Sequence, residues 1–224
     1  MRFGVVVFPG SNCDHDAWYA VSKNLGHSAE FIWHDSSSLG DVDAVILPGG
    51  FSYGDYLRCG AIAKFSPVMQ AVREFASRGG LVIGICNGFQ VLTEAGLLPG
   101  ALQKNRRLRF LCTPTVVRID STGSVLTGSA TVGTELCMPI NHFSGSYVCD
   151  DHTRDELRRE GRVVLRYVDN PNGSVDDIAG ICSAAGNVVG LMPHPERASD
   201  MLLGSTDGLV LLRSLIDAAV RTPA

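Results

Sequence analysis

The segment Leu81-Val82-Ile83-Gly84-Ile85-Cys86-Asn87-Gly88-Phe89-Gln90 carries the strongest structural signal in this chain. Its apolar start predicts a buried strand, and the Gly-x-Cys-x-Gly pattern predicts a sharp turn into a helix. The flanking glycines leave room for a strained backbone that pushes the Cys86 side chain outward. Unpaired N–H groups and the dipole at a helix N-terminus favour the thiolate. The segment therefore predicts a nucleophilic cysteine; the alternative is an ordinary strand-to-helix connection with a buried cysteine.

Other apolar runs of strand length end in turn residues and alternate with segments of helical spacing. This alternation predicts an α/β fold with a mostly parallel sheet and helices on both faces. Between residues 111 and 148 the pattern breaks into short pieces, which predicts a small antiparallel extension. Residues 150–162 predict an exposed helix or loop, and residues 205–220 a closing amphipathic helix. The strand-like runs are 3–8, 29–33, 44–47, 81–85, 163–168 and 188–192, and the helical segments between the early ones include 14–25 and 62–76.

The composition is that of an ordinary globular protein. Hydrophobic residues make up 45% of the 224 residues and charged residues 19%, with a net charge of −4. These values argue against a nucleic-acid-binding or disordered chain, and the length suits a single domain, expected to span 1–224. The first apolar run is too short for a signal peptide or a membrane span, so we expect a cytoplasmic protein with no membrane partner.

The cysteines are scattered along the chain without a Cys-x-x-Cys pair. Their odd number and spacing argue against a disulfide framework or a zinc knuckle and favour a reducing compartment. We therefore expect no bound metal, and we interpret all of them except Cys86 as small buried side chains. The seven are Cys13, Cys59, Cys86, Cys112, Cys137, Cys149 and Cys182.

A thiolate nucleophile needs a base and a group that orients the base. His194 follows the strand-like run 188–192, and prolines on both sides restrict its backbone. Glu196 lies on the same turn, where its carboxylate can hold one ring nitrogen. Because turns after parallel strands gather at one edge of a sheet, we predict a Cys86-His194-Glu196 catalytic triad. Without the cysteine motif, a solvated Pro-His-Pro-Glu surface turn is the better interpretation.

Pro48-Gly49-Gly50 forms another turn after an apolar run. Paired glycines leave backbone N–H groups free to approach a ligand closely. We predict that the N–H groups of Gly50 and Asn87 form an oxyanion hole for a tetrahedral intermediate. The commoner use of two glycines is a plain turn, which is the alternative here.

The cysteine and histidine motifs together resemble those of the class I, triad-type glutamine amidotransferases, whose fold is flavodoxin-like. Further motifs narrow the resemblance to the glutaminase subunits of phosphoribosylformylglycinamidine synthase, and the similarity runs nearly end to end. The stretch Phe51-Ser52-Tyr53-Gly54-Asp55-Tyr56 is specific to that branch. The matching segments are 8–14, 48–58, 86–100 and 192–197.

The resemblance implies an enzyme of the fourth step of purine synthesis. Cys86 would attack the carboxamide of L-glutamine while His194 relays protons, and water would then hydrolyse the thioester to glutamate. Ammonia would pass to a separate synthetase subunit that converts formylglycinamide ribonucleotide to its amidine with ATP, and a small third subunit would join the complex. The chain has neither a P-loop pattern nor a Gly-x-Gly-x-x-Gly fingerprint, so we expect no cofactor in it, and ATP and Mg²⁺ on the partner.

The family pattern also implies residues that bind glutamine, namely Gly49, Gln90 and the segment 139–145. This chain has Asn141-His142-Phe143-Ser144-Gly145 where relatives tend to have His-Gly-Glu-Gly. His142, Phe143 and Ser144 are the corresponding candidates for substrate binding, and a structural hydrogen bond is the alternative role of His142.

A basic cluster precedes the antiparallel segment. It is either a solvated face or the surface that meets the synthetase. The cluster consists of Lys104, Arg106, Arg107 and Arg109.

Three other functions remain open from the sequence. One is a glutaminase that serves another synthetase, in guanylate, histidine or pyrimidine synthesis. Another is a cysteine-elbow protein of the peptidase, chaperone or glyoxalase type, although Asn87 stands where a histidine commonly follows the cysteine in the hydrolytic members. The third is a scaffold that has kept the fold without catalysis.

Overall fold

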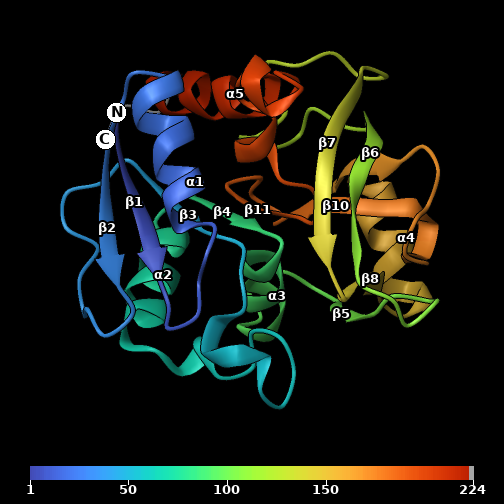
Figure 1. The fold of residues 1–224 in the computed structure, drawn as a ribbon, viewed down its shortest axis with the longest axis horizontal. Helices are drawn as coiled ribbons and strands as arrows, with labels where there is room; N and C mark the ends of the chain where they lie inside the picture. Colours follow the sequence, from blue (N-terminus) through green and yellow to red (C-terminus); the bar gives the residue numbers. More distant parts are fainter. Residues whose placement is uncertain (222–224) are drawn as a thin grey trace.

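The computed structural model describes residues 1–221, and its centre is a nine-stranded sheet (Figure 1). The last three residues of the expected domain, 222–224, lie outside the described residues. The strand order is β2-β1-β3-β4-β11-β10-β9-β6-β7, and β5 and β8 form a separate two-stranded sheet. The strands are β1 (Arg2–Val7), β2 (Ser28–Trp33), β3 (Ala44–Leu47), β4 (Leu81–Ile85), β5 (Ala101–Lys104), β6 (Leu111–Ile119), β7 (Glu135–His142), β8 (Ser144–Val148), β9 (Val163–Tyr167), β10 (Ile178–Cys182) and β11 (Val188–Leu191).

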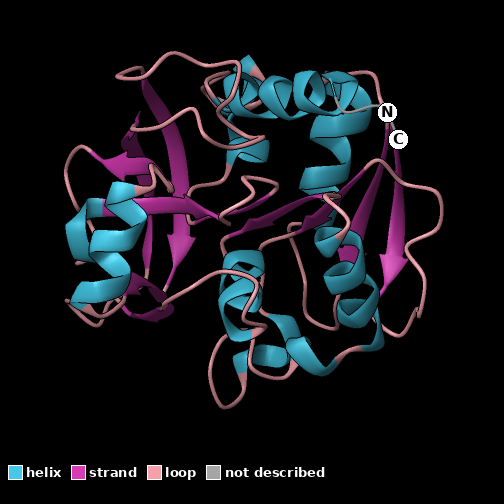
Figure 2. Ribbon diagram, turned by 180° about the vertical axis from the view of Figure 1, so that it is seen from behind, coloured by secondary structure: helices cyan, strands magenta, loops and turns pink. Residues whose placement is uncertain are grey.

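The five strands from β2 to β11 in this order pair in parallel. Every residue of β3, β4 and β11 is buried, as expected for parallel strands covered on both faces. In Figures 1 and 2, α1 and α5 lie above these strands and α2 and α3 below them. The predicted α/β architecture is therefore confirmed. The helices are α1 (Asp14–Tyr19), α2 (Pro67–Ser77), α3 (Asn87–Glu94), α4 (Asp151–Arg159) and α5 (Gly208–Arg221).

The remaining four strands of the large sheet pair antiparallel. The extension predicted between residues 111 and 148 therefore continues the main sheet through β6 and β7, and only β8 leaves it to pair with β5. The run 163–168 forms a strand, but it joins this antiparallel part rather than the parallel one. Sequence reasoning did not predict β10, whose short stretch Ile-Ala-Gly-Ile-Cys has little strand character of its own.

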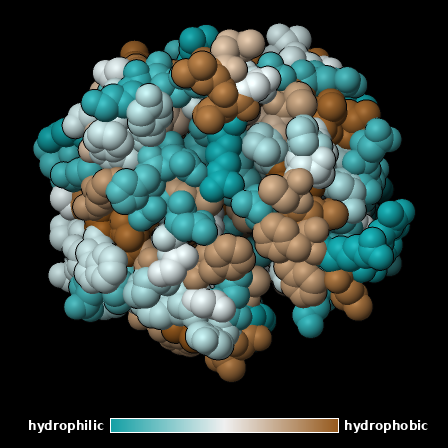
Figure 3. All heavy atoms as spheres, viewed as in Figure 1, coloured by the Kyte–Doolittle hydropathy of each residue, from teal (hydrophilic) through white to brown (hydrophobic). Residues whose placement is uncertain are grey.

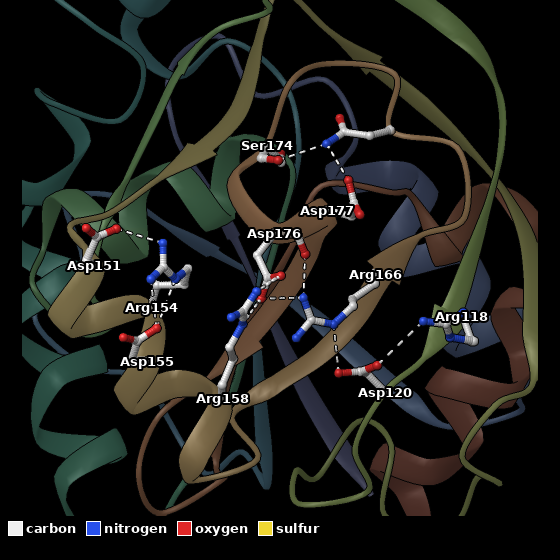
Figure 4. Close-up of polar contacts among 11 residues, drawn as sticks. Arg118, Asp120, Asp151, Arg154, Asp155, Arg158, Arg166, Ser174, Asp176 and Asp177 are labelled. Atoms are coloured by element: carbon white, nitrogen blue, oxygen red, sulfur yellow. Dashed lines mark hydrogen bonds and ion pairs between the residues drawn. The ribbon is translucent and has the colours of Figure 1, made fainter.

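A network of ion pairs attaches α4 to the antiparallel part of the sheet (Figure 4). Asp176 accepts from Arg158 of α4, with Nε to Oδ2 at 2.6 Å, and also pairs with Arg166 of β9. Arg166 in turn donates through Nε to Asp120 at 2.8 Å. Asp176 has a φ of 55°, a left-handed conformation that Asp tolerates better than most residues. These side chains fix the turn before β10.

The surface mixes polar and apolar residues. Figure 3 shows hydrophilic residues interspersed with smaller groups of hydrophobic ones on the face seen in Figure 1. Within the described part of the chain, no helix combines the length and the apolar character needed to cross a bilayer.

Candidate active site

The segment around Cys86 forms the predicted turn. Cys86 follows β4 directly and has φ 51° and ψ −103°, a conformation that is costly for a residue with a side chain. A Cβ atom on Gly84 would lie 2.6 Å from the backbone carbon of Gly88, and one on Gly88 would lie 2.0 Å from the carbonyl oxygen of Leu47. Both glycines are therefore required by close backbone packing, which holds the cysteine in its strained position.

His194 follows β11, the strand next to β4, which leads into Cys86. Ile85 and Leu191 are partners in the parallel register of β4 and β11, and the Cys86 N–H donates to the Leu191 carbonyl at 2.7 Å. His194 comes three residues later, so the two side chains lie at the same carboxyl edge. The backbone N–H of His194 also donates to Pro139 of β7 at 2.9 Å, which fixes the turn from the other side.

The His194 imidazole is held by Glu196. Its Nδ1 lies 2.6 Å from Glu196 Oε1, and the two residues are only 1% and 2% exposed. A carboxylate that accepts from Nδ1 leaves Nε2 as the unprotonated nitrogen. Nε2 has no hydrogen-bond partner among residues 1–221. It is therefore available to take a proton, as a general base requires.

The protonation state of the Cys86 thiol differs from the one that the sequence predicted. Helix position favours the thiolate, but Cys86 is 4% exposed, and this burial raises the pKa of the thiol well above its ordinary value. The charge of Glu196 raises the pKa further, and the Asn87 backbone N–H only partly opposes these effects. The resting thiol is thus protonated. Sequence reasoning was wrong on this point because desolvation outweighs the helix terminus.

The glycine turn after β3 faces the same edge. A Cβ atom on Gly49 would lie 2.8 Å from Cε1 of His194, so Gly49 packs directly against the imidazole. Gly50 has a φ of 132°, which is difficult for any other residue. Outside the regular helix and sheet bonds, the N–H groups of Gly50 and Asn87 donate to no backbone acceptor in residues 1–221. The Gly50 N–H can therefore donate to a ligand, whereas the Asn87 N–H already interacts with the Cys86 sulfur.

A cavity of about 780 Å³ opens beside Cys86. Cys86 and five other predicted site residues line this cavity. Four further predicted site residues, Gly49, Asn87, His194 and Glu196, do not line it. The lining residues among the predicted ones are Gly50, Cys86, Gln90, His142, Phe143 and Ser144.

Gln90 makes internal contacts at both ends of its amide. It accepts from Asn87 Nδ2 at 2.8 Å and donates to the Ser144 carbonyl. Asn87 in turn accepts from the Ser52 N–H at 3.0 Å and donates to Asp55 at 3.1 Å. The Asn87 side chain therefore ties the turn at Cys86 to the loop after β3. Sequence reasoning used only its backbone N–H and missed this role, for which the specific 51–56 motif was the available signal.

His142 makes the structural hydrogen bond considered as its alternative role. Its Nδ1 lies 3.1 Å from Asn105 Oδ1, and Asn105 Nδ2 donates to the carbonyls of His142 and Arg109. Burial lowers the pKa of His142 to about 4, with a smaller contribution from the nearby His194. His142 is thus a neutral side chain at neutral pH. Asn105 was missed because no sequence pattern marks it.

Cys13 lies closer to the catalytic edge than its sequence position suggested. A Cβ atom on Gly49 would lie 3.1 Å from the Cys13 sulfur, and Arg197 Nη2 donates to the same sulfur at 3.1 Å. Arg197 Nε also donates to Asp16 of α1 at 2.9 Å. Burial raises the pKa of the Cys13 thiol to about 12. All seven cysteines are free thiols.

Comparison with known proteins agrees with this geometry. The family described as "CobB/CobQ-like glutamine amidotransferase domain" matches residues 1–207. The chain is thus a glutamine amidotransferase, which is an enzyme.

Individual relatives match over nearly the whole chain. The phosphoribosylformylglycinamidine synthase subunit PurQ of Rubrobacter xylanophilus is 58% identical over 98% of this chain and 99% of its own. That of Koribacter versatilis is 53% identical over 99% of this chain and 100% of its own. The solved structure "PurLQS from Thermotoga maritima" matches with a TM-score of 0.89 and 43% identity, over 96% of this chain and 97% of that one. The chain belongs to the PurQ family.

Proposed function

We propose that this chain is the glutaminase subunit of phosphoribosylformylglycinamidine synthase in purine biosynthesis. The names of its full-length relatives support this branch over the other glutaminases and over a cysteine-elbow protein of another class. The single observation that carries the catalytic part is the strained Cys86 directly after β4, at the same sheet edge as a buried His194–Glu196 pair. Retention of this arrangement also argues against a non-catalytic scaffold.

In this proposal, His194 Nε2 takes the Cys86 proton as the sulfur attacks the carboxamide carbon of glutamine. The N–H groups of Gly50 and Asn87 stabilise the resulting oxyanion, a contribution of roughly 3 kcal/mol for each donor. Collapse of the intermediate returns the proton from His194 to the leaving ammonia and leaves a γ-glutamyl thioester. Water, deprotonated by His194, then releases glutamate and restores the thiol. Glu196 keeps the imidazole in the tautomer that each step needs.

The cavity of about 780 Å³ is the proposed glutamine site. The cavity is large enough to hold an amino acid and still leave its mouth open. Gly49, Gln90, His142, Phe143 and Ser144 are the proposed substrate contacts. Gln90 and His142 also form hydrogen bonds within the protein, and through these bonds they would keep the cavity wall rigid.

The mouth of the cavity is the proposed docking surface for the synthetase. Leu57 and Leu108 line it and are 89% and 67% exposed, and both hold left-handed backbone conformations. Arg58, Lys104 and Arg106 add positive charge there. An apolar rim with basic residues fits a partner surface that is apolar and acidic. Ammonia formed at Cys86 would leave through this mouth into the partner.

The solved relative is titled as a complex, PurLQS, and we extend that assembly to this chain as a synthetase and a small third subunit. ATP and Mg²⁺ are then bound by the synthetase, and this chain carries no cofactor of its own. A single domain over 1–224 and a cytoplasmic location complete the proposal.

The test replaces Cys86 with serine in the assembled complex. We expect Cys86→Ser to abolish synthesis from glutamine and to leave synthesis from an ammonium salt intact, because only the glutaminase step uses the thiol. The matched control is Cys59→Ser, which changes another thiol in the wall of the same cavity and should retain both activities. Glutamine-dependent synthesis by Cys86→Ser would refute the proposal.

A further inference from the structure

Cys13, His194 and Glu196 bring a thiol, an imidazole and a carboxylate together. One prospective ligand atom from each lies within 4.8 Å of the others. The three residues are 2%, 1% and 2% exposed, so the cluster is almost fully enclosed by protein. Cys13 precedes α1, whereas the other two follow β11, and only the fold makes them neighbours. The catalytic steps proposed above leave Cys13 without a role.

The three ligand types together suit zinc better than they suit magnesium or calcium. Zn²⁺ binds sulfur, nitrogen and oxygen in a tetrahedral arrangement, whereas the harder cations prefer oxygen alone. With bonds of about 2.0–2.3 Å, ligand atoms in such a site lie roughly 3.3–3.6 Å apart. The present spread of up to 4.8 Å therefore requires shifts of about 1 Å, within reach of side-chain adjustment.

A second cavity, of about 570 Å³, offers a path to this cluster. Glu196 lines it together with Asp16, Asp200 and Arg197, so acidic groups outnumber basic ones along the path. Glu196 Oε2 is buried and has no hydrogen-bond partner in residues 1–221. That oxygen can bind a cation without giving up another contact in the protein.

Arg197 is the group that opposes a cation. Its Nη2 donates to the Cys13 sulfur at 3.1 Å, and its charge is repelled by a metal bound there. The guanidinium lies at the wall of the second cavity and keeps a separate bond from Nε to Asp16 at 2.9 Å. It can therefore swing away from the sulfur and remain paired.

We propose that Cys13, His194 and Glu196 form a binding site for a divalent cation of the zinc type, and that occupation of the site inhibits the enzyme. Binding releases the Cys13 thiol proton to solvent and forms a metal–thiolate bond. The His194 Nδ1 proton moves to Nε2, so that Nδ1 binds the metal in place of its hydrogen bond to Glu196. A cation held by the imidazole and the carboxylate prevents His194 from exchanging protons with Cys86. The inhibitory part rests on the proposed glutaminase mechanism, whereas the binding part does not.

Cobalt is the probe for binding, because a Co²⁺–thiolate bond gives a charge-transfer absorption band in the near ultraviolet. We expect the full-length protein to show this band with one equivalent of Co²⁺. The Cys86→Ser variant should show it as well, and Cys13→Ala should not. Cys13→Ser, which keeps the side-chain size, repeats the measurement if the alanine variant folds poorly. A band that survives in Cys13→Ala, or that never forms in the wild type, overturns the site.

Zinc is the probe for inhibition of glutamate release. Cys13→Ala should keep its metal-free rate and need at least about 10-fold more Zn²⁺ for half inhibition, since it lacks one of three ligands. Mg²⁺ should not inhibit either protein. Equal zinc sensitivity of Cys13→Ala and the wild type would assign the inhibition to Cys86 and refute the proposal. If glutaminase activity is absent altogether, the cobalt band still decides whether the site binds metal.

Discussion

Replacement of Gly49 by alanine should impair catalysis without unfolding the protein. Gly49 does not have a positive φ, so alanine fits its backbone, but the new methyl group would lie 2.8 Å from Cε1 of His194. An ordinary contact begins near 3.4 Å, so the ring must move by about 0.6 Å. The ring cannot move freely, because Nδ1 is bonded to Glu196 at 2.6 Å and the backbone N–H to Pro139 at 2.9 Å.

The expected loss follows from this displacement. A misplacement of about 1 Å at a reacting group can cost about 100-fold in rate, so kcat of Gly49→Ala should fall roughly 10- to 100-fold. The strain should lower the free energy of unfolding by about 1–3 kcal/mol. Glutamate release measures the first effect and urea unfolding the second. The KM for glutamine should change much less than kcat, because the imidazole acts on the proton and not on binding.

Gly123→Ala is the matched control. It also lacks a positive φ, and its new methyl group would meet only the half-buried Ser121 hydroxyl at 3.2 Å and, at the ordinary contact distance of 3.5 Å, the Gly161 carbonyl oxygen. It should retain both activity and stability. A Gly49→Ala protein with kcat within twofold of the wild type would show that the imidazole is not held as tightly as argued.

Glu196→Gln should leave the fold intact and lower kcat by about 100-fold or more, because an amide no longer enforces the Nδ1–H tautomer of His194. Steady-state glutaminase kinetics measure this loss, and an unchanged kcat would remove Glu196 from the triad. Asp176→Asn keeps the left-handed turn and removes the charge, so unfolding at pH 7 should cost about 1–2 kcal/mol less. Since the hydrogen bond from Arg158 holds the pKa of Asp176 below its ordinary value, that difference should fade as the pH falls below about 4, and a constant difference down to pH 3 would contradict this. Burial raises the pKa of Cys86, so its alkylation by iodoacetamide, followed by peptide mapping, should still accelerate above about pH 9. A rate that levels off below pH 7 would mean a resting thiolate.

The sequence predicted the catalytic edge because its signals are local. The glycines around Cys86 and the prolines around His194 each restrict a few residues, and the apolar runs before them mark parallel strands that end at one edge. The protonation state of Cys86 was not predictable in this way. Its pKa depends on which atoms from other segments cover the sulfur, and no local pattern records that.

The same limit explains the missed residues. Asn105 fixes His142, and Cys13 lies beside His194, but the members of each pair are far apart in sequence and no local pattern links them. β10 was missed because its central Ala179 and Gly180 favour a strand only when β9 and β11 flank them. Tertiary packing therefore decided what local preference left open.

The catalytic edge and the loop beside it concentrate unsatisfied polar groups. Five buried side-chain atoms lack a hydrogen-bond partner in the described residues: Ser22 Oγ, Ser52 Oγ, His142 Nε2, His194 Nε2 and Glu196 Oε2. All except that of Ser22 belong to the catalytic edge or to the loop that Asn87 ties to it. Each such atom costs about 1–3 kcal/mol, and the strained Cys86 adds to this. Because the surrounding strands are fully buried, the scaffold can sustain that cost. A ligand that supplies the missing donors and acceptors at this edge recovers part of it, so a buried, neutral thiol and an unpaired base are consistent with a site that becomes reactive only when glutamine occupies it.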